Sequence, residues 1–83
     1  MIITLRAARV NRGYTLKDVA EKVGKNIDTI NKYEIDSTNI PRSLMVDLLK
    51  LYEIDPDNIF FGKELDFIEY NRIRKEEPHE KSL

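Results

Sequence analysis

The residue types that most often carry out chemistry are absent or isolated in this chain of 83 residues. There is no cysteine, which excludes disulfides, thiolate metal sites and a cysteine nucleophile. The one histidine, His79, lies in the charged C-terminal stretch, where no partner ligands converge on it. The aspartates and glutamates fall at positions typical of helix caps and solvated faces, and no glycine-rich phosphate loop is present. We therefore expect no enzyme, no metal or other cofactor, and no small-molecule ligand.

Charge is distributed unevenly along the chain. The sequence holds 14 Lys and Arg against 15 Asp and Glu, for a net charge of −1. Residues 1–34 have a balance of +3, whereas residues 35–83 have a balance of −4. Because phosphate neutralisation supplies much of the affinity of nucleic-acid-binding proteins, the first half is suited to face phosphates. The second half is suited to remain solvated or to meet another protein.

The first half is predicted to form three short helices. Residues 3–12 make the first helix, and a glycine closes it. Thr15 is suited to cap the second helix, with Asp18 in a capping-box position, and Gly24 ends that helix. Asn26 is the N-cap candidate of the third. The apolar stripes are Leu16, Val19, Ala20 and Val23 on the second helix, and Ile27, Ile30 and Tyr33 on the third. Helices this short must be held by packing.

The second half predicts two more helices and an extension. Pro41 is suited to the first turn of a helix whose stripe is Leu44, Leu48 and Leu51. Asp55 can cap a short final helix that ends at Gly62, with Ile59 and Phe60 pointing inward. We therefore expect an all-α fold, with five short helices in a domain of residues 1–62. The extension, residues 63–83, is expected to be helical over 64–75 and disordered in its charged tail.

The stretch GYTLKDVAEKVGKNIDTINKYE, from Gly13 to Glu34, resembles the Cro/C1-type (XRE) helix-turn-helix family of the phage 434 and λ repressors. IPRSLMVDLLKLYEIDPDNIFFG is similar to the closing helices of that family. The resemblance covers roughly residues 3–62 and implies a five-helix, λ-repressor-like DNA-binding domain. The implied structural positions are Ala20 at the helix crossing, Gly24 in the turn, Ile30 between the helices, and Arg9 and Glu34 bridging the first and third helices.

The resemblance also implies which residues meet double-stranded DNA. In this family the second helix lies across the backbone, and the third enters the major groove. Ile27, Asp28 and Lys32 match base-reading positions. The positions that match phosphate or groove-edge contacts are Thr15, Asn26, Thr29, Asn31 and Arg42. The implied function is a sequence-specific transcriptional regulator, a repressor of bacterial or phage type.

Two positions depart from the family pattern. Leu16 stands where many members have a glutamine that grips a phosphate, and Asp28 puts a negative charge in a reading position. Asp28 can accept a hydrogen bond from cytosine or simply stabilise the first helical turn. Ile27 can pack on a thymine methyl group or within the protein, and Lys32 can reach guanine or a phosphate. With the net charge, these departures favour an alternative: a protein-interaction module on the same scaffold, antirepressor or antitoxin-like, with little DNA binding.

One short domain makes few base contacts, so we expect a homodimer on a two-fold symmetric operator. Phe61, Leu65 and Ile68 are the candidate apolar contacts of that dimer, whereas the neighbouring Phe60 is expected in the core. No apolar run reaches the length of a signal peptide or of a membrane span. The lack of disulfides agrees with this, and we expect a cytoplasmic protein with no membrane partner.

Overall fold

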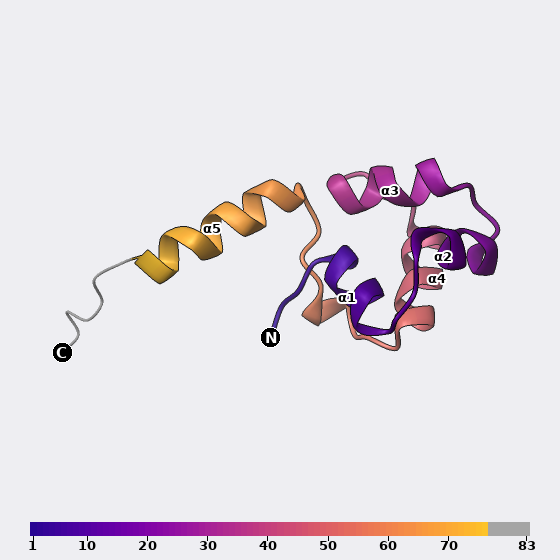
Figure 1. Cartoon of the computed structure of the whole chain (residues 1–83), viewed down its shortest axis with the longest axis horizontal. Coiled ribbons are helices and arrows are strands. Elements are labelled where there is room, and N and C mark those ends of the chain that lie inside the picture. Colours follow the sequence, from indigo (N-terminus) through magenta and orange to yellow (C-terminus); the bar gives the residue numbers. More distant parts are fainter. Residues whose placement is uncertain (77–83) are drawn as a thin grey trace.

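The computed structural model describes residues 1–76, which form five α-helices and one 3₁₀ turn (Figure 1). The elements are α1 (Leu5–Asn11), α2 (Leu16–Val23), α3 (Ile27–Ile35), α4 (Arg42–Tyr52), η1 (Pro56–Asn58) and α5 (Glu64–Glu76). The described residues contain no β-strand, and only two isolated bridges join Ile3 to Ile59 and Asp36 to Lys63. The predicted all-α fold is confirmed, and of the five α-helices four lie within residues 1–62 and the fifth, α5, lies in the extension.

Side-chain caps fix where the first three helices begin. Thr4 Oγ1 accepts a hydrogen bond from Ala7 N at 3.1 Å at the start of α1. At α2, Thr15 Oγ1 accepts from Asp18 N at 3.0 Å, and Asp18 Oδ2 accepts from Thr15 N at 2.9 Å. This reciprocal pair is a capping box. Asn26 Oδ1 accepts from the backbone of α3 in the same way, so the caps predicted for α2 and α3 are present.

The hydrophobic core lies where α1, α2, α3 and α4 meet. Its buried members are Leu5, Ala8, Val19, Ala20, Ile30, Leu44, Leu48, Leu49, Tyr52 and Ile59. Full burial of one aliphatic side chain contributes about 1.5–3 kcal/mol, so this cluster can hold helices that are too short to be stable alone. On α4, Leu44 and Leu48 are buried as predicted, whereas Leu51 is only half-buried.

Pairing between the start of the chain and the segment after η1 corrects two predicted helix bounds. Ile3 N donates to Asn58 O at 2.9 Å, and Phe60 N donates to Ile3 O at 2.9 Å. A backbone that makes these long-range bonds is not available for helical ones. Consequently α1 begins at Leu5 rather than at residue 3, and the predicted final helix before Gly62 is reduced to the single turn η1.

The two adjacent phenylalanines lie in different surroundings. Phe61 is partly buried and packs against the hydrophobic core, and its contact with a second copy stays a prediction. Phe60 instead contacts Phe67 of α5, with ring centroids 4.9 Å apart. Phe60 is therefore not part of the predicted core, because the extended backbone at Ile59 replaces the predicted helix and changes which side chains point inward.

Helix α5 extends away from the rest of the domain, towards the left of Figure 1. The chain accordingly has principal extents of 50 × 21 × 20 Å. Leu65 and Ile68, the other two predicted interface residues, are exposed on this helix. The tail predicted to be disordered, with His79, falls in residues 77–83, outside the described residues. None of the described helices is long and apolar enough to cross a membrane.

Candidate nucleic-acid interface

Helices α2 and α3 are joined by a tight turn that requires a left-handed residue. Gly24 supplies it, with φ 73° and ψ 33°, a conformation that glycine adopts without a Cβ penalty. Lys25 N then donates to Ala20 O at 3.0 Å, which satisfies a carbonyl at the end of α2. Ala20 and Ile30 are buried where the two helices pack. The two helices are therefore held in a fixed helix-turn-helix arrangement.

The first turns of α3 present a chemically varied face to solvent. Ile27 is 43% exposed, and Asp28 and Lys32 are exposed as well. Because Asp28 and Lys32 are four residues apart, they lie on the same side of the helix. An acceptor, a cation and an apolar side chain are thus presented together. This combination can distinguish base-pair edges in a major groove.

Asn26 and Thr29 form a small polar unit at the N-terminus of α3. Asn26 Oδ1 accepts from Thr29 N and from Thr29 Oγ1, both at 2.9 Å. This arrangement orients the Asn26 side chain at the exposed end of the helix. Thr29 and Asn31 are half-buried, so only part of each side chain faces solvent. Their geometry suits contacts at the edge of a groove rather than deep insertion.

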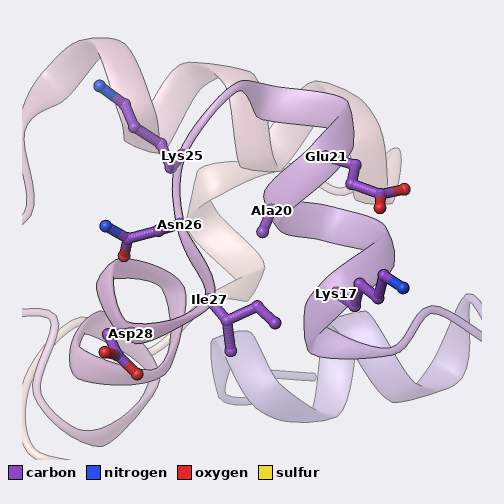
Figure 2. A pocket seen from close by; sticks show the side chains of 7 residues that line it. All are labelled: Lys17, Ala20, Glu21, Lys25, Asn26, Ile27 and Asp28. Atoms are coloured by element: carbon purple, nitrogen blue, oxygen red, sulfur yellow. The ribbon is translucent and has the colours of Figure 1, made fainter.

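A hollow of about 490 Å³ lies between α2 and the start of α3 (Figure 2). It is lined by Lys17, Ala20, Glu21, Lys25, Asn26, Ile27 and Asp28. Ala20 and Ile27 point towards the space between the helices, and the charged side chains surround them. The hollow therefore combines an apolar floor with a charged rim.

A buried ion pair sets the position of α3 against α1. Arg9 Nε donates to Glu34 Oε2 at 2.6 Å, and Arg9 Nη2 donates to Glu34 Oε1 at 3.2 Å. Arg9 Nη1 also donates to the carbonyl oxygen of Tyr14 at 2.9 Å. Burial, with the Glu34 carboxylate nearby, raises the pKa of the Tyr52 phenol well above its ordinary value. The structure thus brings together the two residues that the sequence assigned to bridging these helices, in a bidentate and directional contact.

A second arginine, which sequence analysis missed, extends this ion pair to α5. Arg6 Nε donates to Glu64 Oε2 at 2.8 Å, and Arg6 Nη1 lies 3.8 Å from Glu34 Oε1. The hydrogen bond to Glu64 raises the pKa of Arg6 above its ordinary value. The available sequence signal was the three-residue spacing of Arg6 and Arg9, which places both guanidinium groups on one side of α1.

Backbone bonds also fasten the segment before α5 to the end of α3. Ser37 N donates to Gly62 O at 2.9 Å, and Gly62 N donates to Ser37 Oγ at 2.9 Å. The bridge between Asp36 and Lys63 continues this pairing by one residue on each side. The first turn of α5 is therefore fixed to the C-terminal end of α3. No local pattern signals this contact, because its partners are 25 residues apart.

The other predicted contact residues lie at the starts of α2 and α4. Thr15 is exposed, and its hydrogen bonds to Asp18 lower the pKa of that carboxyl. Leu16 is partly buried against the core, which accounts for its apolar side chain. Arg42 is exposed as the first residue of α4. Across residues 1–76, no three His, Asp or Glu side chains gather in a way that could hold a metal ion.

Comparison with known proteins gives one family. A protein-family model described as a helix-turn-helix domain matches residues 2–65. No curated protein matches the sequence. The matched segment contains α1 to α4, η1 and the first residues of α5, and it therefore includes the whole α2–α3 surface.

Proposed function

Because this chain belongs to that family of helix-turn-helix domains, we propose that it is a transcriptional regulator that binds duplex DNA sequence-specifically through α3. The observation that carries this proposal is the exposed face of α3. Ile27, Asp28 and Lys32 face solvent, while Ile30 on the same helix is fully buried. A recognition helix must combine a rigid attachment with an exposed, chemically varied face, and α3 has both.

The base-reading roles follow from the chemistry of these three side chains. In the proposed complex, the N-terminal half of α3 enters the major groove. The Ile27 side chain packs on a thymine methyl group, and the Asp28 carboxylate accepts a hydrogen bond from cytosine N4. The Lys32 ammonium group donates to guanine O6 or N7. The residues proposed to contact phosphates or groove edges are Thr15, Asn26, Thr29, Asn31 and Arg42.

We further propose that the protein is a cytoplasmic repressor of the Cro/C1 type, with residues 1–62 as its DNA-binding domain. It acts as a homodimer on a two-fold symmetric operator, because one recognition helix contacts too few base pairs to select a site in a genome. The exposed Leu65 and Ile68 support a dimer contact in the second half of the chain.

A second candidate function is a protein-interaction module that has lost DNA binding. The observation that favours it is the mixed charge of the proposed interface, where Glu21 and Asp28 lie beside Lys17 and Lys25. Carboxylates at this surface oppose phosphate binding through their charge. Salt dependence separates the two functions, because phosphate contacts weaken steeply with added salt and a largely apolar protein contact does not.

The experiment is selection from a randomised duplex pool with the purified full chain at two salt concentrations, followed by sequencing of the bound DNA. Enrichment of a palindrome that weakens at high salt is the expected result. Salt-sensitive binding without enrichment would leave a non-specific DNA binder. If the protein retains no DNA even at low salt, the regulator proposal is wrong and the protein-interaction function takes its place.

A further inference from the structure

Helix α5 has apolar side chains that its own domain does not cover. Leu65 is 74% exposed, Ile68 is 51% exposed and Ile73 is 49% exposed. Isolated helices shorter than about 12–15 residues are marginal in water, and much of α5 extends beyond the domain (Figure 1). Additional packing on this helix would stabilise it.

The covered and uncovered sides of α5 can be told apart. Phe67 faces the domain, since its ring contacts that of Phe60. Leu65 lies two residues earlier and therefore on roughly the opposite side of the helix. Where α5 leaves the domain there is also a hollow of about 450 Å³, whose lining includes Ile3, Ala7, Phe67 and Ile68. The exposed apolar positions thus continue from the outer side of α5 to the edge of this hollow.

The charges of α5 are divided between its two halves. Residues 64–69 hold three acidic side chains and no basic one, whereas residues 70–76 hold three basic side chains and one acidic one, Glu76, so the two halves carry formal charges of −3 and +2. Two such helices in antiparallel order place each acidic half beside a basic half. In parallel order like charges meet, and this is destabilising. The charge pattern therefore identifies a second α5, in reverse direction, as the complementary partner.

We propose that α5 binds α5 of a second copy of this chain in antiparallel order, across the side that carries Leu65 and Ile73. The two-fold axis crosses the helix at Glu69, so Leu65 and Ile73, near opposite ends of the exposed side, meet each other. At the axis itself the charge of each Glu69 is offset by its ion pair with Arg72 of the same helix. This inference specifies the dimer contact of the regulator proposed above. The consequence of this pairing for the spacing of half-sites in the operator rests on that function, whereas the pairing itself does not.

The attachment of α5 gives the pairing a consequence for recognition. Ser37 and Gly62 exchange hydrogen bonds at the end of α3, and Glu64 is bound by Arg6. Each α5 is thus fixed to its own α3 at the point where the two helices approach. Pairing of two α5 helices sets the separation and relative orientation of the two recognition helices, and hence the spacing of half-sites in the operator.

The first test measures association of the full chain by sedimentation in the absence of DNA. Wild type is expected to form a dimer, and the variant Leu65→Ser/Ile73→Ser is expected to lose at least about tenfold in dimer affinity through lost apolar burial. Val10→Ser is the matched control, because Val10 is an exposed apolar residue on α1. Circular dichroism checks that each variant folds. A monomeric wild type, or a dimer that the double variant leaves unchanged, would overturn the proposal.

The second test determines the direction of pairing. The chain has no cysteine, so single-cysteine variants report one position each. Leu65→Cys and Ile73→Cys chains, distinguished by a tag, are mixed and oxidised. A disulfide needs Cα atoms about 4.4–6.8 Å apart, so antiparallel pairing favours the mixed disulfide. Predominance of the two symmetric disulfides would show parallel pairing and overturn the proposal.

These outcomes are independent of DNA binding. A dimer with the mixed disulfide that fails to select DNA would contradict the proposed function and leave the α5 contact standing. A monomer that still selects DNA would contradict the α5 contact and leave the proposed function standing.

Discussion

Glu34 is a carboxylate almost without access to solvent, since its side chain is 2% exposed. Its oxygens accept two hydrogen bonds from Arg9, a residue that cannot give up its own charge. Glu34→Gln leaves that guanidinium buried without a counter-charge. We expect the free energy of unfolding to fall by about 3–5 kcal/mol, measured by urea denaturation at neutral pH.

The exposed ion pair between Arg12 and Glu53 provides the matched control. Its N–O distance is 2.8 Å, close to the distances in the buried pair, but both side chains are in contact with water. Glu53→Gln is therefore expected to change stability by no more than about 1 kcal/mol. Equal losses for the two substitutions would mean that burial does not strengthen the Arg9–Glu34 contact.

Substitutions of Lys32 and Arg42 distinguish a side chain that contacts a base from one that contacts a phosphate. If Lys32 contacts a guanine, Lys32→Ala relaxes the preference at one base pair by about 1–3 kcal/mol. Arg42→Ala weakens binding to all sequences alike, since a phosphate carries no sequence information. Lys50→Ala, an exposed charge on α4, controls for the loss of one positive charge. The measurement is affinity for the selected operator and its single-base variants, and a uniform loss with Lys32→Ala would contradict its base contact.

At the scale of the element, the start of α2 is held by a capping box that includes the carboxyl group of Asp18, whose charge changes with pH. Hydrogen bonds from the Thr15 backbone and hydroxyl hold the pKa of Asp18 below its ordinary value. A group whose pKa is lower in the folded state stabilises above its unfolded pKa, about 3.9, and loses this contribution as pH falls through the folded value. We therefore expect Asp18→Asn to destabilise the protein at neutral pH, with a difference from wild type that shrinks in acid.

Thermal unfolding of both proteins between neutral and strongly acidic pH checks this expectation. Asp47→Asn removes an exposed aspartate that caps no helix and controls for the loss of one surface carboxylate. A stability difference for Asp18→Asn that stays constant over the whole range would show that the capping box does not depend on the Asp18 charge.

Elements defined by local signals could be predicted from the sequence. The caps Thr15 and Asn26, and the left-handed Gly24, act within a few residues of their position, and they place α2 and α3 correctly. The prediction of a helix before Gly62 was wrong because this segment is determined by a long-range contact rather than by local signals. Its backbone bonds to Ile3 at the other end of the domain, and no periodicity within the segment reports such a partner.

The candidate site likewise contains contacts that the sequence predicted and contacts that it did not. Arg9 and Glu34 were assigned from resemblance to a family motif, because the pair joins residues 25 apart. Arg6 and Glu64, 58 residues apart, belong to no such motif and were missed, although they connect the same ion pair to α5. The surface proposed to meet DNA could thus be predicted from the sequence, whereas its connection to the rest of the molecule required the structure.

At the scale of the whole molecule, the overall charge of −1 conceals a basic first part and an acidic second part, which correspond to the proposed DNA-binding and dimer-forming regions. Residues 1–34, with the positive balance, contain α2 and all of α3 except its last residue, whereas much of the negative charge lies beyond α3. The acidic residues of α5 complement the basic half of the same helix in a second copy. A near-neutral chain can therefore bind a polyanion through one region while the other provides the contact between copies.

This division predicts how loss of α5 pairing affects DNA binding. Leu65→Ser/Ile73→Ser keeps the α2–α3 surface intact, so its affinity for a duplex with one half-site should equal that of wild type. On a duplex with both half-sites wild type binds as a dimer, and the variant should bind more weakly. The slope of log affinity against log salt is about −0.9 per neutralised phosphate, so it should fall by about half when one domain binds instead of two. Fluorescence anisotropy over a salt series measures both quantities, with Val10→Ser as the control. An unchanged slope on the full operator would mean that the copies cooperate through a surface other than α5.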